Sequence, residues 1–424
     1  MNKVFYPGLN ETLYSCKMEN GLTVQVLPRP GFSRKLAYFV TDFGSIHTEF
    51  LLDGKKIKAP AGVAHFLEHK MFELPGRDVS AEFAALGANV NAFTSYDVTA
   101  YYFSCTENFL PSLRLLLEFV STPYFTEESV KREIGIIDQE IGMNADSPER
   151  VFENLMQAMY CSHPIRVPIL GSRESIREIT PEILNQCHRA FYTPANMILC
   201  VVGDVDPQQV LDTARQVLGD EKKEAGSKLR PWQEEMTCHR ETVRMPMEVA
   251  MPNFQLGFKC ESVGTGEDAI RQEIIGDLAA EALFGESSEL YLQLYESGLI
   301  DSSFGGGFET VDGCALLTCG GDSNQAEKVR DAIVARAEEL ASTGIPDADL
   351  LRMKRSALGR RIRDLDSFDS TCFRLCAYQL SDFDYFRFPG VYTDVTAAQV
   401  CAFLEKVIKK ERCALSVIEP RRQS

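Results

Sequence analysis

The segment Gly62-Val-Ala-His-Phe-Leu-Glu-His-Lys-Met-Phe72 places two histidines and one glutamate on a single face of an expected helix. At 3.6 residues per turn, His65, Glu68 and His69 point to the same side. Neutral imidazole is a preferred ligand of zinc, and a carboxylate beside the metal can take a proton from its bound water. His-x-x-Glu-His is the inverse of the commoner zincin order. Because the 424 residues contain only six histidines, the pattern favours a zinc site over two surface histidines on an amphipathic helix.

A catalytic zinc ion needs three protein ligands and keeps a fourth position for water. The segment Glu133-Ile-Gly-Ile-Ile-Asp-Gln-Glu140 offers a candidate, since its two glutamates lie two helical turns apart on one face. An adjacent apolar stripe contains Ile134, Ile137 and Ile141. Acidic residues on a helix more often form a solvated face, so the spacing alone leaves the third ligand open.

Length and composition indicate an ordinary globular protein with more than one core. A chain of 424 residues is too long for one core and predicts two domains. The hydrophobic share of 45% and the charged share of 25% are typical of globular proteins. The net charge of −17 disfavours nucleic acid and anionic membranes as partners, because both require basic patches.

The cysteines and the hydropathy pattern predict a cytoplasmic protein without a membrane partner. Thirteen cysteines are scattered along the chain without a Cys-x-x-Cys pair, which favours reduced thiols. The first residues lack the apolar core of a signal peptide, and no stretch approaches the ~20 apolar residues that span a bilayer.

The order of the expected elements repeats once along the chain. The first half has expected strands at 23–27, 36–43, 89–94 and 99–104, and expected helices at 60–74, 79–86 and within 107–145. The second half has expected strands at 253–260, 303–309 and 313–319, and expected helices at 268–285, 287–297, 324–341 and 347–364. Strands followed by helical runs predict an α+β fold, in which helices pack on one face of a mainly antiparallel sheet.

A charged segment with few apolar residues, 219–247, lies between the halves and has the composition of a linker. We therefore predict an N-terminal domain at 1–218 that carries the zinc motif, a linker at 219–247 and a C-terminal domain at 248–424. Periodicity alone leaves open whether the two domains are homologous; the family resemblance described below implies that they are, with the N-terminal zinc-binding domain as the catalytic one. No histidine follows residue 239, so the second domain cannot supply an imidazole ligand. The expected helix at 268–285 is then a packing helix, and we expect one Zn²⁺ per chain.

The chain resembles the pitrilysin, insulin-degrading enzyme and mitochondrial processing peptidase family of inverzincins, and most of all its half-length bacterial members of the YmfH type. The resemblance covers essentially the whole chain. It rests on the segment from Gly62 to Phe72, on Gly87-Ala-Asn-Val-Asn-Ala-Phe-Thr94 with Asp97, Thr99 and Tyr101, on the helix with Glu133 and Glu140, and on Leu170-Gly171 before Ser175-Ile176.

This resemblance implies a role for each candidate residue. Glu140 would be the third zinc ligand beside His65 and His69, and Glu68 would be the general base. Glu133 would support the site from behind. The expected edge strand Asn91-Ala92-Phe93-Thr94 would pair with an extended peptide substrate, and the two homologous domains would form the halves of a clam shell.

Two functions are compatible with the resemblance. The first is a zinc metalloendopeptidase that cleaves short or unfolded peptides, and the second is a non-catalytic docking subunit that has kept only the fold. Silent subunits resemble the family but lose its His or Glu residues. Here His65, Glu68, His69 and Glu140 are all present, which favours the enzyme.

The resemblance also implies a partner. Family members that are active alone carry an Arg and a Tyr, seven residues apart, in the second half. When the motif is anchored on Gly298, these positions hold Leu292 and Leu299, and leucine cannot donate the hydrogen bonds that an oxyanion needs. We therefore expect a heterodimer with a homologous, zinc-less subunit that supplies the pair. The alternative is a homodimer that works without it.

Overall fold

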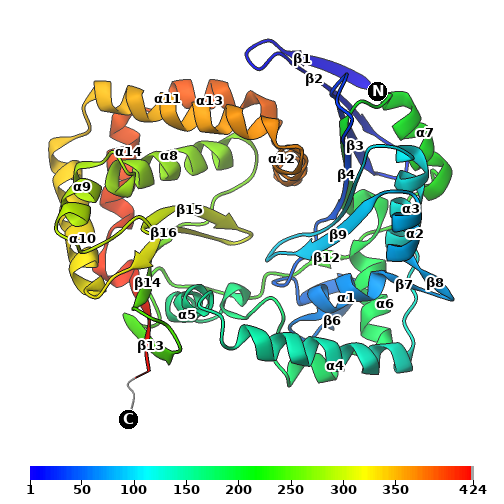
Figure 1. Cartoon of the computed structure of the whole chain (residues 1–424), viewed down its shortest axis with the longest axis horizontal. Coiled ribbons are helices and arrows are strands. Elements are labelled where there is room, and N and C mark those ends of the chain that lie inside the picture. Colours follow the sequence, from blue (N-terminus) through cyan, green and yellow to red (C-terminus); the bar gives the residue numbers. More distant parts are fainter. Residues whose placement is uncertain (422–424) are drawn as a thin grey trace. The chain divides into compact units, whose positions relative to one another are not determined.

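The computed structural model describes residues 1–421, which form two compact units (Figure 1). Unit 1 consists of residues 1–141, 168–231 and 362–386, and unit 2 consists of residues 142–167, 232–361 and the described residues from 387 onward. Both units are therefore discontinuous in sequence, since segments from each half of the chain contribute to each unit.

Unit 1 is built on a mixed, mainly antiparallel sheet with the strand order β1-β2-β3-β11-β4-β10-β9. Its strands are β1 (Asn2–Tyr6), β2 (Glu11–Lys17), β3 (Thr23–Pro28), β11 (Met197–Gly203), β4 (Lys35–Thr41), β10 (Thr99–Cys105) and β9 (Asn89–Thr94). The pair β3–β11 is parallel, and the other neighbouring pairs are antiparallel. Strand β9 forms one edge of this sheet, which agrees with the prediction of an edge strand at Asn91–Thr94.

Helices cover both faces of this sheet. Those of unit 1 are α1 (Val63–Met71), α2 (Val79–Ala85), α3 (Phe109–Ser121), most of α4 (Glu127–Asn144), α6 (Pro181–Phe191), α7 (Pro207–Leu218) and α12 (Phe368–Leu380). Successive side chains of a strand point to opposite faces. Tyr101 and Phe103 of β10 pack against Phe119 of α3 and Phe83 of α2, whereas Tyr102 points to the opposite face, where α12 packs on β11 and β4.

Unit 2 contains a second sheet with the order β13-β17-β14-β16-β15. Its strands are β13 (Thr242–Met247), β17 (Cys413–Pro420), β14 (Asn253–Cys260), β16 (Cys314–Asp322) and β15 (Gly305–Val311). Its helices are α5 (Arg150–Met159), α8 (Gly266–Phe284), α9 (Glu289–Glu296), α10 (Ala326–Thr343), α11 (Asp347–Arg363, almost entirely in this unit), α13 (Phe388–Asp394) and α14 (Ala397–Val407).

The two sheets share one topology. The order β3-β11-β4-β10-β9 in unit 1 corresponds to β13-β17-β14-β16-β15 in unit 2, and the parallel pair occupies the same place in both. The order of the helices along the chain also corresponds, so that α1, α3 and α6 match α8, α10 and α14. The predicted α+β fold with two similar halves is therefore confirmed.

One pair of corresponding helices is exchanged between the units. Helix α5 comes from the first half of the sequence but packs on β14 and β17 of unit 2, and its counterpart α12 packs on β11 and β4 of unit 1. Gly257 of β14 permits the close approach of α5, because a Cβ atom there would lie 2.5 Å from Met159 Sδ. The prediction of helices on one face is thus incomplete, since each sheet has an exchanged helix on its other face.

The predicted element limits agree with the structure most closely for strands 89–94 and 253–260. The zinc-motif helix is shorter than the predicted 60–74, because Gly62 adopts a positive φ of 90° immediately before α1 and Phe72 ends it. The helical run predicted within 107–145 divides into α3 and α4 around Pro123. The contiguous domains 1–218 and 248–424 were predicted from the repeated halves of the sequence, and they stay a prediction.

The segment predicted as a linker is attached to both units. Its first part contains β12 (Ser227–Lys228), which joins β5 (Glu49–Leu52) and β6 (Lys55–Lys58) in a small sheet. Lys228 also forms an ion pair with Asp42 at 2.6 Å. A further short hairpin, β7 (Glu73–Leu74) with β8 (Arg77–Asp78), follows α1.

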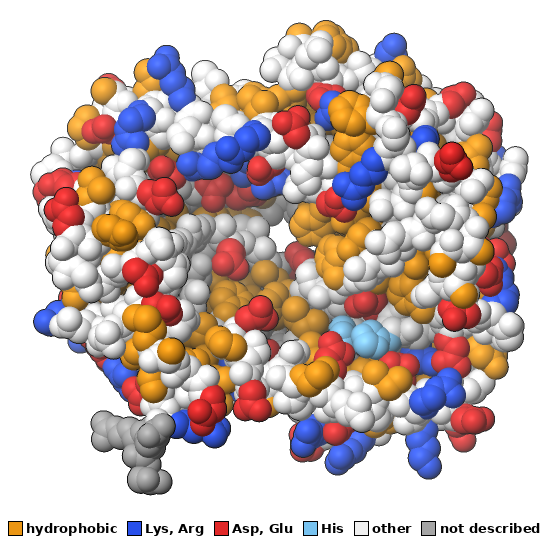
Figure 2. Space-filling view, viewed as in Figure 1, with side chains coloured by type: hydrophobic (Ala, Val, Ile, Leu, Met, Phe, Trp, Pro, Cys, Tyr) orange, Lys and Arg blue, Asp and Glu red, His pale blue; other side chains and the backbone are white. Residues whose placement is uncertain are grey.

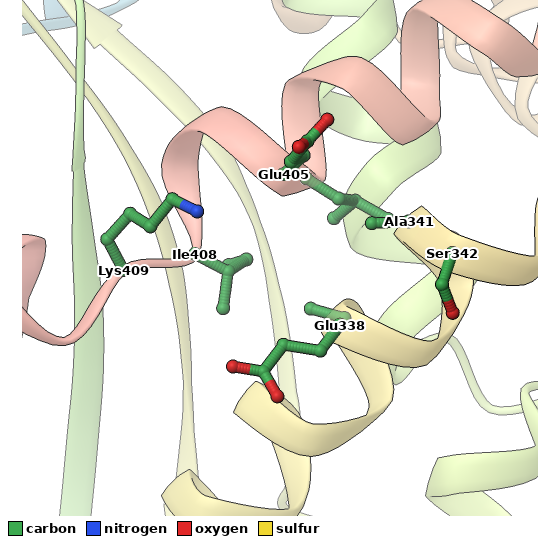
Figure 3. A pocket seen from close by; sticks show the side chains of 8 residues that line it. Glu338, Ala341, Ser342, Glu405, Ile408 and Lys409 are labelled. Carbon is green, nitrogen blue, oxygen red and sulfur yellow. The ribbon is translucent and has the colours of Figure 1, made fainter.

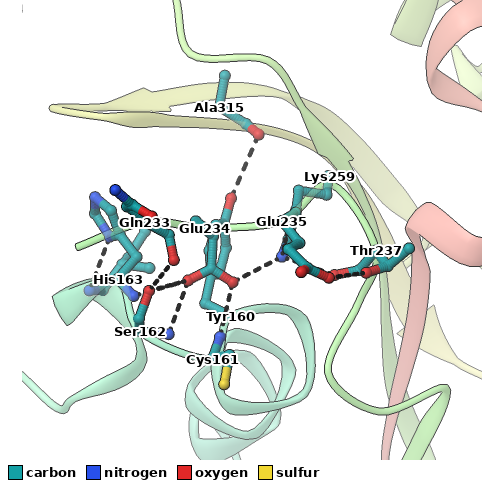
Figure 4. Close-up of polar contacts among 11 residues, drawn as sticks. Tyr160, Cys161, Ser162, His163, Gln233, Glu234, Glu235, Thr237, Lys259 and Ala315 are labelled. Carbon is teal, nitrogen blue, oxygen red and sulfur yellow. Dashed lines mark hydrogen bonds and ion pairs between the residues drawn. The ribbon is translucent and has the colours of Figure 1, made fainter.

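The second part of this segment is held by a buried ion pair in unit 2 (Figure 4). Lys259 is nearly inaccessible and donates to Glu234 Oε1 at 3.0 Å and to the carbonyls of Glu235 and Thr237. The Glu234 carboxylate also accepts the backbone N–H groups of residues 161–163 after α5. Burial alone raises the pKa of Glu234, but these donors outweigh it and lower the pKa to about 2.

Charged side chains of both signs are spread over the surface. On the face drawn in Figure 2, Lys and Arg side chains lie among Asp and Glu side chains instead of gathering in one basic patch. Among the described residues, no helix combines the length and the apolar character that crossing a bilayer requires.

The ion pair of Glu234 predicts a pH-dependent contribution to stability. Replacing Glu234 with Gln leaves Lys259 buried without a counter-charge, so we expect a loss of ~2–4 kcal/mol at pH 7. Because the carboxyl pKa is lower in the folded state, this stabilisation is present above the ordinary pKa of 4.5 and is lost as the pH falls toward 2. Urea unfolding at pH 7 and pH 3 measures the difference. Glu235→Gln, which removes a neighbouring carboxylate outside the ion pair, should have little effect, and equal stability of both variants at pH 7 would contradict this account.

Candidate metal centre

The first turn of α1 is fixed where two stretches of backbone cross. Gly62 and Gly171 both have positive φ angles, of 90° and 75°. A Cβ atom on Gly62 would lie 2.5 Å from the Leu170 carbonyl oxygen, and one on Gly171 would lie 2.5 Å from the Ala61 carbonyl oxygen. The Ser175 hydroxyl donates to this same Ala61 carbonyl at 2.8 Å. Only glycine permits so close a crossing, and the crossing sets the direction of α1.

Helices α1 and α4 bring three possible metal ligands together. His65 Nε2 lies 3.7 Å from Glu140 Oε1, and His69 Nε2 lies 3.9 Å from Glu140 Oε2. One ligand atom from each of the three residues lies within 4.8 Å of the others. His65 is buried, whereas His69 and Glu140 are partly exposed, so the group is reachable from solvent. Two imidazoles and one carboxylate with open access fit the donor set of a catalytic zinc ion.

Glu133 orients one of these imidazoles from behind. Its Oε1 lies 3.0 Å from His69 Nδ1, and the Glu133 side chain is buried on α4. The hydrogen bond to Glu133 raises the pKa of His69. When Nδ1 carries the proton of the neutral ring, Nε2 has a free lone pair on the side of Glu140 and can bind a metal ion. This carboxylate–imidazole arrangement is the usual outer support of a metal-binding histidine.

His65 lies in a less polar environment than His69. Burial and the neighbouring His69 lower the pKa of His65 to about 4. The imidazole is therefore neutral at physiological pH, which is the form that binds metal. Its Nδ1 has no hydrogen-bond partner among the described residues. His65 thus depends on the packing of α1 for its orientation.

Glu68 lies next to these ligands and is held by strand β9. Its Oε2 accepts a hydrogen bond from the Thr94 hydroxyl at 2.7 Å. The next threonine, Thr99, donates to the Phe43 carbonyl and lies 3.5 Å from the Thr94 oxygen. Burial raises the pKa of Glu68, although the Thr94 hydrogen bond opposes this shift. The sequence predicted Thr94 only as a residue of the substrate strand, and its contact with the Glu68 carboxylate was not predicted.

The remaining residues of β9 lie on either side of the sheet edge. Asn91 is exposed, and Phe93 points to the face of α12, where it contacts Phe373 with ring centroids 5.7 Å apart. Ala92 and Thr94 alternate to the face of α1. Phe373 was not predicted as a site residue, because its helix comes from the second half of the sequence and packs on unit 1 only in the folded chain.

The second half carries no comparable group. The helix α8, which corresponds to α1, contains no histidine, and no other cluster of three possible ligands occurs in the described part of the chain. Leu292 lies exposed on α9, and Leu299 lies three residues after this helix ends at Glu296. Neither leucine has a polar side-chain atom.

Comparison with known proteins defines the class. Residues 56–173 match the family model described as insulinase, peptidase family M16, and residues 178–357 match the model described as the inactive domain of peptidase M16. The chain is also 36% identical over 425 residues to the zinc protease YmfH of Bacillus subtilis (strain 168), with 98% of each chain covered. The chain therefore belongs to peptidase family M16.

The chain and the zinc protease YmfH have nearly the same length, since the match covers 98% of each. A second zinc protease of Bacillus subtilis (strain 168), YmxG, is 26% identical and covers 74% of this chain and 76% of its own. A solved M16-like peptidase from Alicyclobacillus acidocaldarius has a TM-score of 0.93 at 32% identity, with 97% of this chain and 98% of that chain covered. A protease from Helicobacter pylori shares the fold, with a TM-score of 0.82 at 21% identity, covering 96% and 99% of the two chains.

The crossing at Gly62 predicts how the candidate metal centre responds to a substitution that removes no ligand. Alanine at position 62 has to adopt a left-handed backbone and would clash with the Leu170 carbonyl, so we expect Gly62→Ala to destabilise the fold by at least ~2 kcal/mol. It should also weaken zinc binding, because α1 begins at this residue. Thermal unfolding and zinc titration measure the two effects. Gly54→Ala is the matched control, since Gly54 also has a positive φ but nothing within 4 Å of an added Cβ atom. Equal zinc affinity in both variants would contradict this role of the crossing.

Proposed function

We propose that this chain is the catalytic subunit of a zinc metalloendopeptidase that cleaves short or unfolded peptides. The observation that carries the proposal is the convergence of His65, His69 and Glu140 beside the carboxylate of Glu68. His65, His69 and Glu140 would hold one zinc ion, and Glu133 would orient His69. The donor set supports this assignment, because imidazole and carboxylate ligands with an open side are typical of catalytic rather than structural zinc.

Each residue of the proposed site has a separate role in peptide hydrolysis. A bound zinc ion supplies a water of lowered pKa and polarises the scissile carbonyl. Glu68 takes the proton of the attacking water and delivers it to the leaving amine, as a general base and then a general acid. Burial raises the pKa of Glu68, which suits a carboxyl group that must both accept and return a proton. Thr94 holds this carboxylate in place through its hydroxyl group.

Strand β9 would hold the substrate. Its outer edge has no neighbouring strand in the seven-stranded sheet, so the backbone of Asn91–Thr94 can pair with an extended peptide. Backbone pairing gives affinity with little demand on sequence, which suits a peptidase of unfolded chains. The side chains of Asn91 and Phe93 would then flank one face of the bound peptide, and those of Ala92 and Thr94 the other.

We further propose that the active form is a heterodimer with a homologous, zinc-less subunit. Leu292 and Leu299 occupy the positions that hold an Arg and a Tyr in family members active alone, and neither leucine can stabilise an oxyanion. The presence of two half-length relatives in one Bacillus subtilis strain supports paired subunits. The alternative is a homodimer that works without the pair. The scattered cysteines of the sequence support a cytoplasmic location.

A non-catalytic docking subunit is the other candidate function. It is less well supported, because a silent subunit has no need of the buried Glu68 or of the Glu133–His69 hydrogen bond.

The first test separates the base from the metal ligands. Glu68→Gln should keep about one zinc ion per chain, because Glu68 is not a ligand, and should lower peptide turnover by ~10²–10⁴-fold, the usual contribution of a general base. His69→Ala and Glu140→Ala should lose the metal. Metal analysis of the purified variants and hydrolysis of a quenched fluorescent peptide measure both effects. Wild-type turnover by Glu68→Gln would disprove the mechanism.

The second test concerns the role of Thr94. Thr94→Val removes the hydroxyl but keeps the shape of the side chain, so we expect kcat to fall by ~10-fold with KM and zinc content unchanged. Thr94→Ser, which restores a hydroxyl, should recover most of the rate. A rise in KM with unchanged kcat would instead assign Thr94 to substrate binding.

The third test concerns the partner. The chain purified alone should bind zinc but cleave peptides slowly, and addition of a homologous zinc-less subunit should raise kcat by at least ~100-fold, the contribution of oxyanion stabilisation. Activity is measured against partner concentration. The matched control is a partner in which its Arg and Tyr are replaced. Full activity of the isolated chain would exclude the heterodimer.

A further inference from the structure

Unit 2 contains a cavity of about 440 Å³ that the proposed metal chemistry does not use. It lies between the end of β14, the first turns of α8 and the second half of α14. Apolar side chains form most of its lining, which includes Val263, Ile275, Phe308, Phe403 and Val407. Phe308 and Phe403 meet edge to face, with ring centroids 5.6 Å apart. The cavity therefore offers an aromatic and aliphatic wall.

Polar and charged side chains also line the cavity. Gln272 and Gln399 provide amide donors and acceptors, and Glu261 forms ion pairs with Lys406 and, at 4.0 Å, with Arg412. Together with Asp268, the cavity has two acidic and two basic lining residues. The charges balance, so the lining favours an uncharged group over an anion or a cation.

The duplicated fold shows what fills the corresponding place in unit 1. Helix α6 corresponds to α14, and each helix precedes one strand of the parallel pair of its sheet, β11 in unit 1 and β17 in unit 2. At the end of α6, Phe191 stacks on Phe43 at 4.3 Å and meets Phe50 edge to face at 4.9 Å. Phe43 and Phe50 come from the connection between β4 and α1, which includes β5 and β6.

In unit 2 this connection is missing its aromatic segment. Only residues 261–265 link β14 to α8, and they contain no aromatic side chain. In unit 1, the rings of Phe43 and Phe50 cover the end of α6. In unit 2, the end of α14, at Phe403 and Val407, borders a cavity instead. The aromatic contacts of unit 1 thus indicate that aromatic side chains would fill the cavity of unit 2.

A second hollow beside α14 has a different character. It has a volume of about 290 Å³ and lies between α10 and α14 (Figure 3). Glu338, Ser342, Glu405 and Lys409 line it, and no aromatic residue does. This second hollow therefore offers no aromatic wall to a ligand.

We propose that the cavity between α8 and α14 binds an uncharged peptide segment with two neighbouring aromatic side chains, as a docking site separate from the metal centre. A volume of about 440 Å³ lies within the usual range of ~300–1,000 Å³ for ligand sites. The two rings replace the missing counterparts of Phe43 and Phe50, and Gln272 and Gln399 hydrogen-bond the peptide backbone. The choice of a peptide as ligand rests on the proposed peptidase function, whereas the aromatic requirement rests on the cavity alone.

The test measures binding apart from cleavage. Acetyl-Ser-Phe-Phe-Ser-amide is titrated by calorimetry into the Glu68→Gln chain, with acetyl-Ser-Ala-Ala-Ser-amide as the control peptide. We expect the aromatic peptide to bind with a Kd of ~0.1–1 mM and the alanine peptide to bind at least ~10-fold more weakly.

A variant that fills the cavity locates the binding site. Ala402 lies exposed on α14 in the cavity lining, so Ala402→Phe occupies the space without removing a core residue. Ala398→Phe, an exposed position on the same helix outside the lining, is the matched control. We expect Ala402→Phe to weaken binding at least ~10-fold and Ala398→Phe to leave it unchanged.

Two results would overturn the proposal: no saturable binding of the aromatic peptide, or equal binding by the Ala402→Phe and Ala398→Phe chains. The second result would place the peptide elsewhere, for example on β9. Neither result bears on the metal centre, whose failure is recognised separately by turnover of Glu68→Gln.

Discussion

The close crossing of the backbone at Gly62 and Gly171 is the constraint on which the candidate metal centre depends. Both residues have positive φ angles, and each would clash with a carbonyl oxygen of the other strand if it carried a Cβ atom. The crossing starts α1 at a defined point and in a defined direction. From that start, His65, Glu68 and His69 follow at helical spacing and face α4. A small error in the direction of α1 would separate the imidazoles from Glu140, because side chains of two different helices must meet within about 4 Å.

Duplication gives the chain two similar sheets, and the two units have diverged in what they hold. Unit 1 has the group of His65, His69 and Glu140, the buried carboxylate of Glu68 and the free edge of β9. Unit 2 has the same strand order but a helix without histidine in the place of α1, and a cavity where unit 1 has Phe43 and Phe50. The exchanged helices α5 and α12 tie the halves of the sequence together, since each unit needs a helix from the other half. Loss of either helix would expose an otherwise covered sheet face.

Local features were predictable from the sequence. Strands 89–94 and 253–260 and the edge position of β9 follow from alternation and the family resemblance, and the structure places them as expected. The zinc-motif helix was also predicted, although it is shorter than expected. Features that depend on tertiary packing were not predictable. The Thr94–Glu68 hydrogen bond requires knowledge of which face of β9 points to α1. The contact of Phe373 with Phe93 requires that α12 packs on the sheet of unit 1. Periodicity along one helix cannot show on which sheet that helix packs.

The central claim is that His65, His69 and Glu140 together bind one zinc ion. Zinc K-edge X-ray absorption of the Glu68→Gln chain loaded with one equivalent of zinc tests it most directly, because it reports the ligand atoms themselves. The account predicts two imidazole nitrogens and oxygen ligands at ~2.0–2.2 Å, with one imidazole signal lost in His69→Ala. Sulfur ligands at ~2.3 Å, or a spectrum unchanged by His69→Ala, would place the zinc at another site and contradict the account.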